Sequence, residues 1–123
     1  MTKIDDFMNQ IICADALKTL KKMPADSIDI IITSPPYNFE MKYDNYNDKH
    51  GWSKYFALLN DVWKECYRVL KKGGRICVNV QPLFSEYVPT HHVVSNQLLE
   101  AGFLWKAEIL WDKHNYNAKY TAW

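Results

Sequence analysis

The run from Ile28 to Thr33 is the feature that most limits how this chain can fold. Four of its six residues are isoleucine, and the prolines Pro35 and Pro36 follow soon after it. A short apolar run of this kind is typical of a buried strand in a parallel sheet. Because proline fixes φ at about −65° and has no N–H to donate, the strand has to end there. The sequence therefore predicts a rigid loop directly after a buried strand.

The composition of this loop suits a binding site for a flat polar group. Ser34 carries a hydroxyl, Tyr37 an aromatic ring and Asn38 a side-chain amide. Each proline favours extended geometry in the residue before it, which leaves the carbonyl groups of Ser34 and Pro35 outside any helical ladder. Such oxygens can accept hydrogen bonds from the exocyclic amine of a nucleobase. The simpler interpretation is an ordinary exit from a strand, in which the prolines only prevent a helix.

Apolar periodicity predicts an alternation of strands and helices along the chain. We expect strands at residues 10–14, 28–33, 75–80 and 103–111, and helices at 16–23, 52–72 and 90–101. This order indicates an α/β protein with a parallel sheet, whose strand at 28–33 is covered on both faces. Residues 38–51 are polar and form a long loop.

Two of the predicted strands end in candidate site residues. Asp15 follows the strand at 10–14, and Ser34 follows the strand at 28–33. Ligands of parallel sheets bind outside the carboxyl ends of the strands. We therefore expect both residues on one rim of the sheet. Gly73 and Gly102 are expected to end helices, and Thr90 to cap the last one.

Composition narrows the class of protein. A chain of 123 residues fits one domain, and its net charge of +1 does not by itself indicate a nucleic-acid binder. No apolar run approaches the ~20 residues of a membrane span, and the N-terminus lacks the apolar core of a secretory signal. The cysteines, Cys13, Cys66 and Cys77, are odd in number and widely spaced. We expect buried, reduced thiols in a cytoplasmic protein, with no disulfide or zinc framework.

The string Ser34-Pro35-Pro36-Tyr37 resembles motif IV of the DNA amino-methyltransferases, which methylate adenine N6 or cytosine N4. Further segments resemble the family in the same order along nearly the whole chain: Ile11–Ala16, Ser27–Ile31, Tyr67–Arg75, Ala101–Phe103 and Ile109–Lys113. The resemblance implies a partial Rossmann-like, mostly parallel methyltransferase sheet. Residues 1–123 would be the N-terminal catalytic part of one domain.

The resemblance also implies roles for individual residues. Ser34, Pro35, Pro36 and Tyr37 would be catalytic, with the Ser34 side chain and the Pro35 carbonyl accepting hydrogen bonds from the target amine. Tyr37 would stack on a base flipped out of double-stranded DNA. S-adenosylmethionine would be the cofactor, contacted by Asp15 and Ser34. An equally good interpretation makes Asp15 a helix N-cap, and one carboxylate could serve both purposes.

Other polar residues have weaker signals. Asn38, Lys42 and Lys113 are candidates for contacts with the base or the DNA, although a solvated loop is the simpler interpretation of Lys42. His91 and His92 are adjacent at the start of a helix, where neighbouring side chains diverge by about 100°. We therefore expect no shared metal site there, and no metal elsewhere.

The sequence contains no glycine-rich turn of the kind that holds the methionine part of S-adenosylmethionine in this family. Permuted members place that turn in a later half, after a target-recognition region. We therefore expect a sheet that lacks the strands of the glycine-rich half, and a chain that is inactive alone. The rest would come from a missing C-terminal half or a second polypeptide, so the chain is a fragment, a split subunit or a remnant.

The nature of the reaction leaves alternatives open. Serine before Pro-Pro-Tyr favours cytosine N4 slightly over adenine N6. A different possibility is a non-catalytic nucleic-acid-binding module, or a remnant that keeps the rim without the cofactor half. A nucleotide-dependent oxidoreductase is disfavoured, because the sequence has no Gly-x-Gly-x-x-Gly motif.

Overall fold

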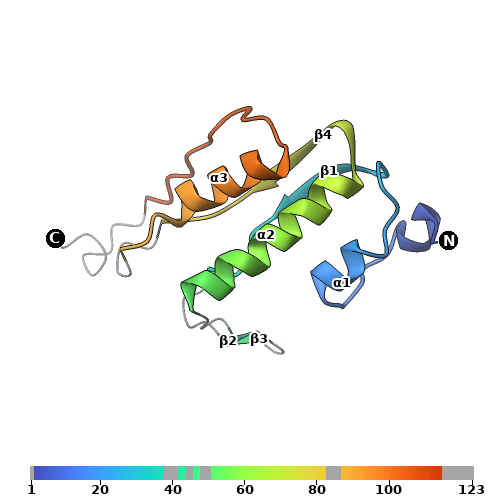
Figure 1. The fold of residues 1–123 in the computed structure, drawn as a ribbon, viewed down its shortest axis with the longest axis horizontal. Coiled ribbons are helices and arrows are strands. Elements are labelled where there is room, and N and C mark those ends of the chain that lie inside the picture. Colours follow the sequence, from blue (N-terminus) through green and yellow to red (C-terminus); the bar gives the residue numbers. More distant parts are fainter. Residues whose placement is uncertain (1, 38–41, 44–45, 48–50, 83–86, 115–123) are drawn as a thin grey trace.

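The computed structural model describes residues 2–37, 42–43, 46–47, 51–82 and 87–114. Its elements in chain order are η1 (Ile4–Phe7), α1 (Ala16–Leu20), β1 (Ile28–Thr33), β2 (Lys42–Tyr43), β3 (Tyr46–Asn47), α2 (Trp52–Val69), β4 (Leu70–Val78) and α3 (Thr90–Ala101). Within these residues, β1 and β4 form a parallel sheet, and β2 and β3 form an antiparallel hairpin (Figure 1). The predicted α/β class with parallel strands is confirmed.

Strands β1 and β4 pair regularly from Ile30 opposite Arg75 to Thr33 opposite Val78. Before that point the register shifts, because two steps along β1 correspond to five steps along β4. Gly73 turns there with φ of +82°, a backbone region that favours glycine. A Cβ on Gly74 would lie 2.8 Å from the Lys71 carbonyl oxygen, so this bulge leaves no room for a side chain.

The predicted end of the long helix is wrong by several residues. Helix α2 ends at Val69, and Leu70 is already extended and buried. Lys71 belongs to β4 and makes a 2.8 Å ion pair with Asp29 at the start of β1. Residues 70–73 thus already belong to β4, at the place where we expected the last turn and the C-cap of the helix. The end of α3 is as predicted, with Gly102 in the left-handed region, but its N-cap is Pro89 rather than Thr90.

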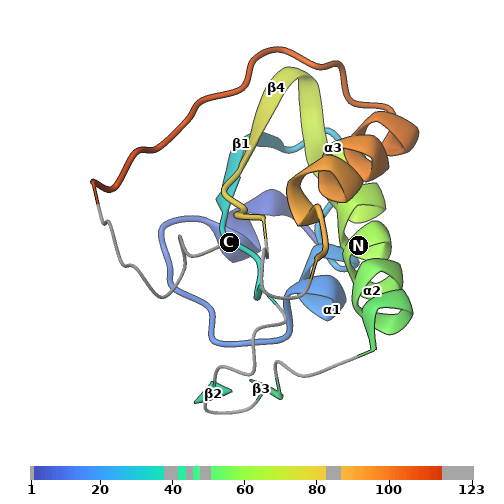
Figure 2. The same ribbon diagram turned by 90° about the vertical axis from the view of Figure 1, so that its left-hand side faces the viewer.

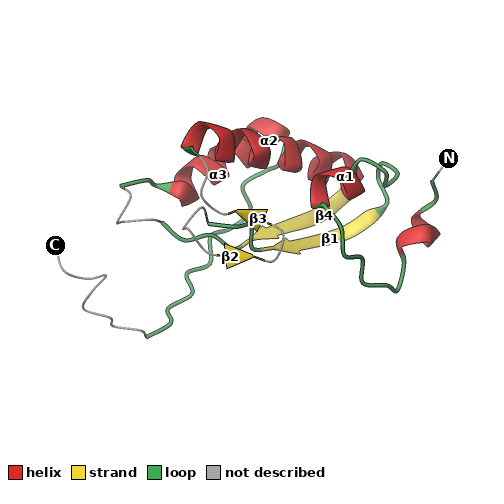
Figure 3. Cartoon of the chain, turned by 90° about the horizontal axis from the view of Figure 1, so that it is seen from below, coloured by secondary structure: helices red, strands yellow, loops and turns green. Residues whose placement is uncertain are grey.

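All three α-helices lie on one side of β1 and β4 (Figure 3). The predicted apolar stripe of α2 packs inwards, and it meets Val94 of α3 in the core. Figure 2 shows α2 and α3 next to each other on this side of the sheet. The stripe places four side chains in the core: Tyr55, Leu59, Trp63 and Cys66.

Polar contacts inside the helical layer fix the helices to one another. The Trp63 indole donates to the Gln97 side-chain oxygen at 3.1 Å, and the Gln97 amide donates to the Phe56 carbonyl at 2.8 Å. The Arg68 guanidinium donates to the carbonyl groups of Leu20 and Met23 at 2.8 and 2.9 Å. It therefore holds the end of α1 against α2.

The other side of the sheet is largely exposed in the described part of the chain. Ile30 and Ile32 are 53% and 76% exposed, and Cys77 is exposed as well. The prediction that this strand is covered on both faces is therefore wrong in the described part of the chain. Buried cysteines are also confirmed only in part, because Cys66 is buried, whereas Cys13 and Cys77 are exposed. All three thiols are free, as expected.

Two predicted strands are absent from the segments where we expected them. The structure describes residues 10–14 and 103–111, and neither segment is a strand. Ile11 and Ile109 are almost completely exposed, since no described strand lies beside them to complete a ladder. Most of the predicted loop at 38–51 lies outside the described residues. No helix in the described ranges is long and apolar enough to cross a membrane.

Candidate active site

The tetrapeptide Ser34–Tyr37 lies at the carboxyl end of β1, directly beside the carboxyl end of β4. The Asn79 N–H donates to the Thr33 carbonyl at 2.9 Å, which extends the strand pairing one step beyond Val78. Carboxyl ends of parallel strands are where such sheets bind ligands. The described sheet therefore presents this loop at the expected rim.

One amide side chain connects the two ends of the tetrapeptide. Asn79 Nδ2 donates to Ser34 Oγ at 3.1 Å and to the Tyr37 hydroxyl at 3.4 Å. The Ser34 side chain is exposed and Tyr37 is half-buried. A hydroxyl group and an aromatic ring are thus held together at the surface of the rim.

The prolines attach the loop to the core. Pro35 is buried, and the Pro36 carbonyl accepts a hydrogen bond from the Tyr55 hydroxyl. Tyr55 is 1% exposed and lies in the first turn of α2, where its ring packs edge-on against Trp52 with centroids 5.5 Å apart. The middle of the loop is therefore anchored to the buried core of the helical layer.

Two backbone carbonyl groups of the loop are also predicted acceptors. No described residue donates to the carbonyl of Ser34 or of Pro35. The described hydrogen-bond partners of the loop, Asn79 and Tyr55, are both neutral groups. Such a site can orient a planar amine, and chemistry there would depend on alignment rather than on a titrating base.

Asp15 is the N-cap of α1. Its Oδ1 accepts a 2.8 Å hydrogen bond from the Lys18 N–H, and its carbonyl accepts one from the Thr19 hydroxyl at 2.8 Å. The capping interpretation is thus confirmed. The expectation that Asp15 shares a rim with Ser34 depended on a strand at 10–14, and those residues form no strand.

The weaker DNA-contact candidates are not brought to the rim by any described contact. Asn38 and the side chain of Lys42 lie outside the described residues. Lys113 Nζ lies 5.3 Å from the centre of the Trp111 ring, a cation–π distance, in an exposed segment. The strand expected to end beside Lys113 is absent from this described segment.

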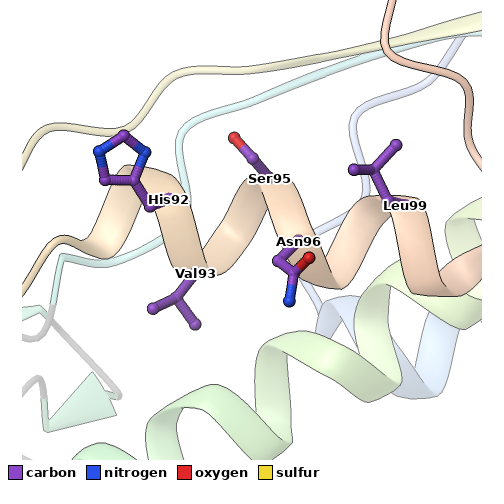
Figure 4. A pocket seen from close by; sticks show the side chains of 5 residues that line it. All are labelled: His92, Val93, Ser95, Asn96 and Leu99. Carbon is purple, nitrogen blue, oxygen red and sulfur yellow. The ribbon is translucent and has the colours of Figure 1, made fainter.

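The rings of His91 and His92 lie next to each other, with centroids 3.9 Å apart and a tilt of 31°, so the two side chains do not diverge as expected. Burial lowers the pKa of His91, as does nearby His92, whereas Glu108 opposes the change. An open hollow on α3 includes His92 (Figure 4). All of its lining residues come from α3: His92, Val93, Ser95, Asn96 and Leu99. It shares no residue with the rim.

Sequence reasoning missed two residues of the site, Asn79 and Tyr55. A usable signal existed for Asn79, because it is the polar residue near the end of the strand predicted at 75–80. The same rule that placed Ser34 at the rim would have placed Asn79 beside it. For Tyr55 the signal was a hydroxyl within an apolar helical stripe, since a buried tyrosine usually finds a hydrogen-bond partner.

Comparison with known proteins gives a consistent set of matches. A family model described as a DNA methylase, of the N6 and N4 amino-methyltransferases, matches residues 28–122. The type II methyltransferase M.MjaVI of Methanocaldococcus jannaschii is 31% identical over 122 residues, which are 97% of this chain and 56% of that protein. The DNA adenine methyltransferase YhdJ of Escherichia coli is 38% identical over 63% of this chain and 26% of its own length.

A solved structure shows the same partial overlap. A candidate DNA modification methylase from Thermus thermophilus, TTHA0409, superposes with a TM-score of 0.58 and 26% sequence identity. The match covers 73% of this chain and 39% of that one. The chain thus spans about half or less of the length of the proteins that it matches, and it has a partial Rossmann-like fold.

Proposed function

Because the chain belongs to the DNA methylase family of N6 and N4 amino-methyltransferases, we propose that it is the part of a DNA methyltransferase that holds the target base. One observation carries the proposal: the tetrapeptide Ser34–Tyr37 lies at the carboxyl end of β1, with its hydroxyl exposed and its ring held beside it. The family acts on DNA, and this loop is the part of the described chain with chemistry suited to an exocyclic amine.

In the proposed site, Ser34 Oγ and the Pro35 carbonyl each accept a hydrogen bond from one N–H of the target amine. These bonds draw the nitrogen towards sp³ geometry, so its lone pair is no longer delocalised into the base. Tyr37 stacks on the flipped base, which contributes about 1–3 kcal/mol of binding. The serine favours cytosine N4 as the target atom over adenine N6.

S-adenosylmethionine is the proposed methyl donor, and the described residues fit only a small part of it. Asp15 has one carboxylate oxygen engaged in capping α1. The sequence has no glycine-rich turn for the methionine part. We therefore assign no transfer step to this chain alone, and we expect the 123-residue chain to be inactive by itself.

The missing part of the site is proposed to come from further protein that covers the open side of the sheet. Ile30 and Ile32 leave an apolar surface there. M.MjaVI is nearly twice as long as the segment it shares with this chain. We propose that this further protein is the other half of the methyltransferase domain, in the same polypeptide or in a second one.

The experiment is methyl transfer to DNA by the chain as printed and by the chain expressed with its flanking coding sequence. Mass analysis of the digested DNA identifies N4-methylcytosine or N6-methyladenine. We expect product from the longer protein, at least tenfold less from Ser34→Ala and Tyr37→Ala, and none from the 123-residue chain. The matched controls are Ser53→Ala and Tyr87→Ala, both at exposed positions.

Two results would contradict these roles. Full activity in both Ser34→Ala and Tyr37→Ala would show that these side chains are not needed for methyl transfer. DNA binding without methylated product from any form of the protein would favour the non-catalytic module instead.

A further inference from the structure

The side chain of Asn79 contacts both functional groups of the candidate base-binding loop. We propose that Asn79 is a positioning residue, which fixes the Ser34 hydroxyl and the Tyr37 ring before a base arrives. The inference depends on the proposed function of the loop, because it assigns a role within that same site.

The backbone of Asn79 is fixed relative to the loop. Its N–H donates to the Thr33 carbonyl at 2.9 Å, at the last step of the β1–β4 pairing. Thr33 directly precedes Ser34, so the amide and the loop start from the same point of the sheet. The Asn79 side chain is exposed. Its contacts are therefore not a by-product of core packing.

The Asn79 amide determines the direction of hydrogen bonding at Ser34. Since Nδ2 donates to Ser34 Oγ at 3.1 Å, one lone pair of the hydroxyl oxygen is occupied and the hydroxyl proton must point elsewhere. A second lone pair stays available to accept a hydrogen bond from the target amine. Neither the Asn79 amide nor the Ser34 hydroxyl carries a charge, so this hydrogen bond orients the acceptor without removing a proton.

The same nitrogen holds the far end of the Tyr37 ring. Its contact with the hydroxyl is 3.4 Å, at the opposite end of the side chain from the backbone. A ring fixed at both ends loses less freedom when a base stacks on it, and such pre-organisation favours binding. Removal of both contacts should therefore impair the alignment of the base much more than it impairs folding.

The first measurement tests the bridge in the 123-residue chain. The side-chain amide of Asn79 is followed by nuclear magnetic resonance in the wild type, Ser34→Ala and Tyr37→Phe. We expect the Nδ2 resonances to shift in both variants. Unchanged resonances in both would overturn the bridge, whether or not the protein methylates DNA.

The second measurement tests positioning in the protein expressed with its flanking coding sequence. We expect Asn79→Leu to lower kcat by about 10- to 100-fold, with the melting temperature unchanged. Asn96→Leu, at an exposed asparagine of α3, is the matched control and should stay within about twofold. In a Ser34→Ala background, Asn79→Leu should have a much smaller effect, because the two residues act through one contact.

The outcomes separate the two proposals. Absence of methyl transfer by the wild type overturns the proposed function, and the resonance test still decides the bridge. An active wild type in which Asn79→Leu matches Asn96→Leu, or in which the Asn79 and Ser34 effects multiply fully, overturns the positioning role.

Discussion

At the scale of single residues, Cys66 shows how packing controls the chemistry of a side chain. It is 3% exposed on the inward face of α2. Burial raises the pKa of its thiol to about 11, and the neighbouring carboxylate of Glu65 acts in the same direction. Cys13 and Cys77 are exposed. The three free thiols should therefore differ sharply in reactivity.

We expect iodoacetamide at pH 8 to alkylate Cys13 and Cys77 and to spare Cys66, because the thiolate is the reactive form and Cys66 is both buried and protonated. Mass spectrometry of tryptic peptides measures each site. In denaturant all three should react. Alkylation of Cys66 at the rate of Cys77 in the folded chain would contradict the burial.

The same pKa shift predicts a loss of stability in alkali. The pKa of Cys66 in the folded chain is raised above its ordinary value of 9.0. The protonated thiol therefore contributes fully to the free energy of unfolding below pH 9, and this contribution is lost as the pH rises towards 11. Denaturant unfolding of the wild type and Cys66→Val across this range measures the difference. We expect the free energy of unfolding to fall by roughly 2 kcal/mol more in the wild type than in Cys66→Val, because only the wild type has this thiol. Parallel curves would show that Cys66 does not titrate there.

At the scale of elements, the contact between α2 and α3 depends on a hydrogen-bonded indole. Trp63 is fully buried, and its N–H donates to Gln97. We expect Trp63→Phe to lower the free energy of unfolding by about 1–3 kcal/mol, because the ring is smaller and Gln97 loses its donor. Urea denaturation with Trp105→Phe, at an exposed tryptophan, is the comparison. Equal free energies of unfolding for the two variants would show that this hydrogen bond contributes little to stability.

The bulge at the start of β4 is another test at this scale. Gly74→Ala would bring a methyl group 2.8 Å from the Lys71 carbonyl and 3.1 Å from the Asp29 carbonyl. We expect a loss of about 1–3 kcal/mol in unfolding free energy. Gly51→Ala has open space around its Cβ, so its loss should be well under that. If both variants unfold at the same denaturant concentration, the bulge must be able to widen.

Patterns of neighbouring residues predicted the elements that depend mainly on local sequence. The apolar run gave β1, and helical spacing gave the inward stripe of α2 with Tyr55 and Trp63 in the core. The segments at 10–14 and 103–111 failed because a strand needs a partner, and the pattern of one segment does not reveal whether that partner exists. The strand-end rule could have placed Asn79 at the rim, but its hydrogen bond to Ser34 joins residues 45 positions apart and no local pattern predicts it.

At the scale of the whole molecule, the sheet has one covered side and one open side. Side chains alternate along β1, so Ile31 packs against the helical core, whereas Ile30 and Ile32 face outwards. Additional exposed apolar side chains follow α3, among them Leu104 and Leu110. A surface of this kind favours association with other protein.

Two neighbouring residues can test this asymmetry. In the isolated chain we expect Ile32→Lys to leave the melting temperature nearly unchanged and to increase the monomeric fraction in sedimentation. Ile31→Lys, on the covered side, should destabilise the fold by several kcal/mol, because a charge would be buried without a partner. Equal destabilisation by both substitutions would mean that the outer side is covered as well.

The hydrogen bond from Tyr55 to Pro36 connects the rim to a helix terminus. Tyr55 is 1% exposed and belongs to the core, so this bond reaches the loop from inside the molecule. Substitutions that loosen the packing around Tyr55 should therefore increase the mobility of Ser34–Tyr37 without altering any exposed group of the loop.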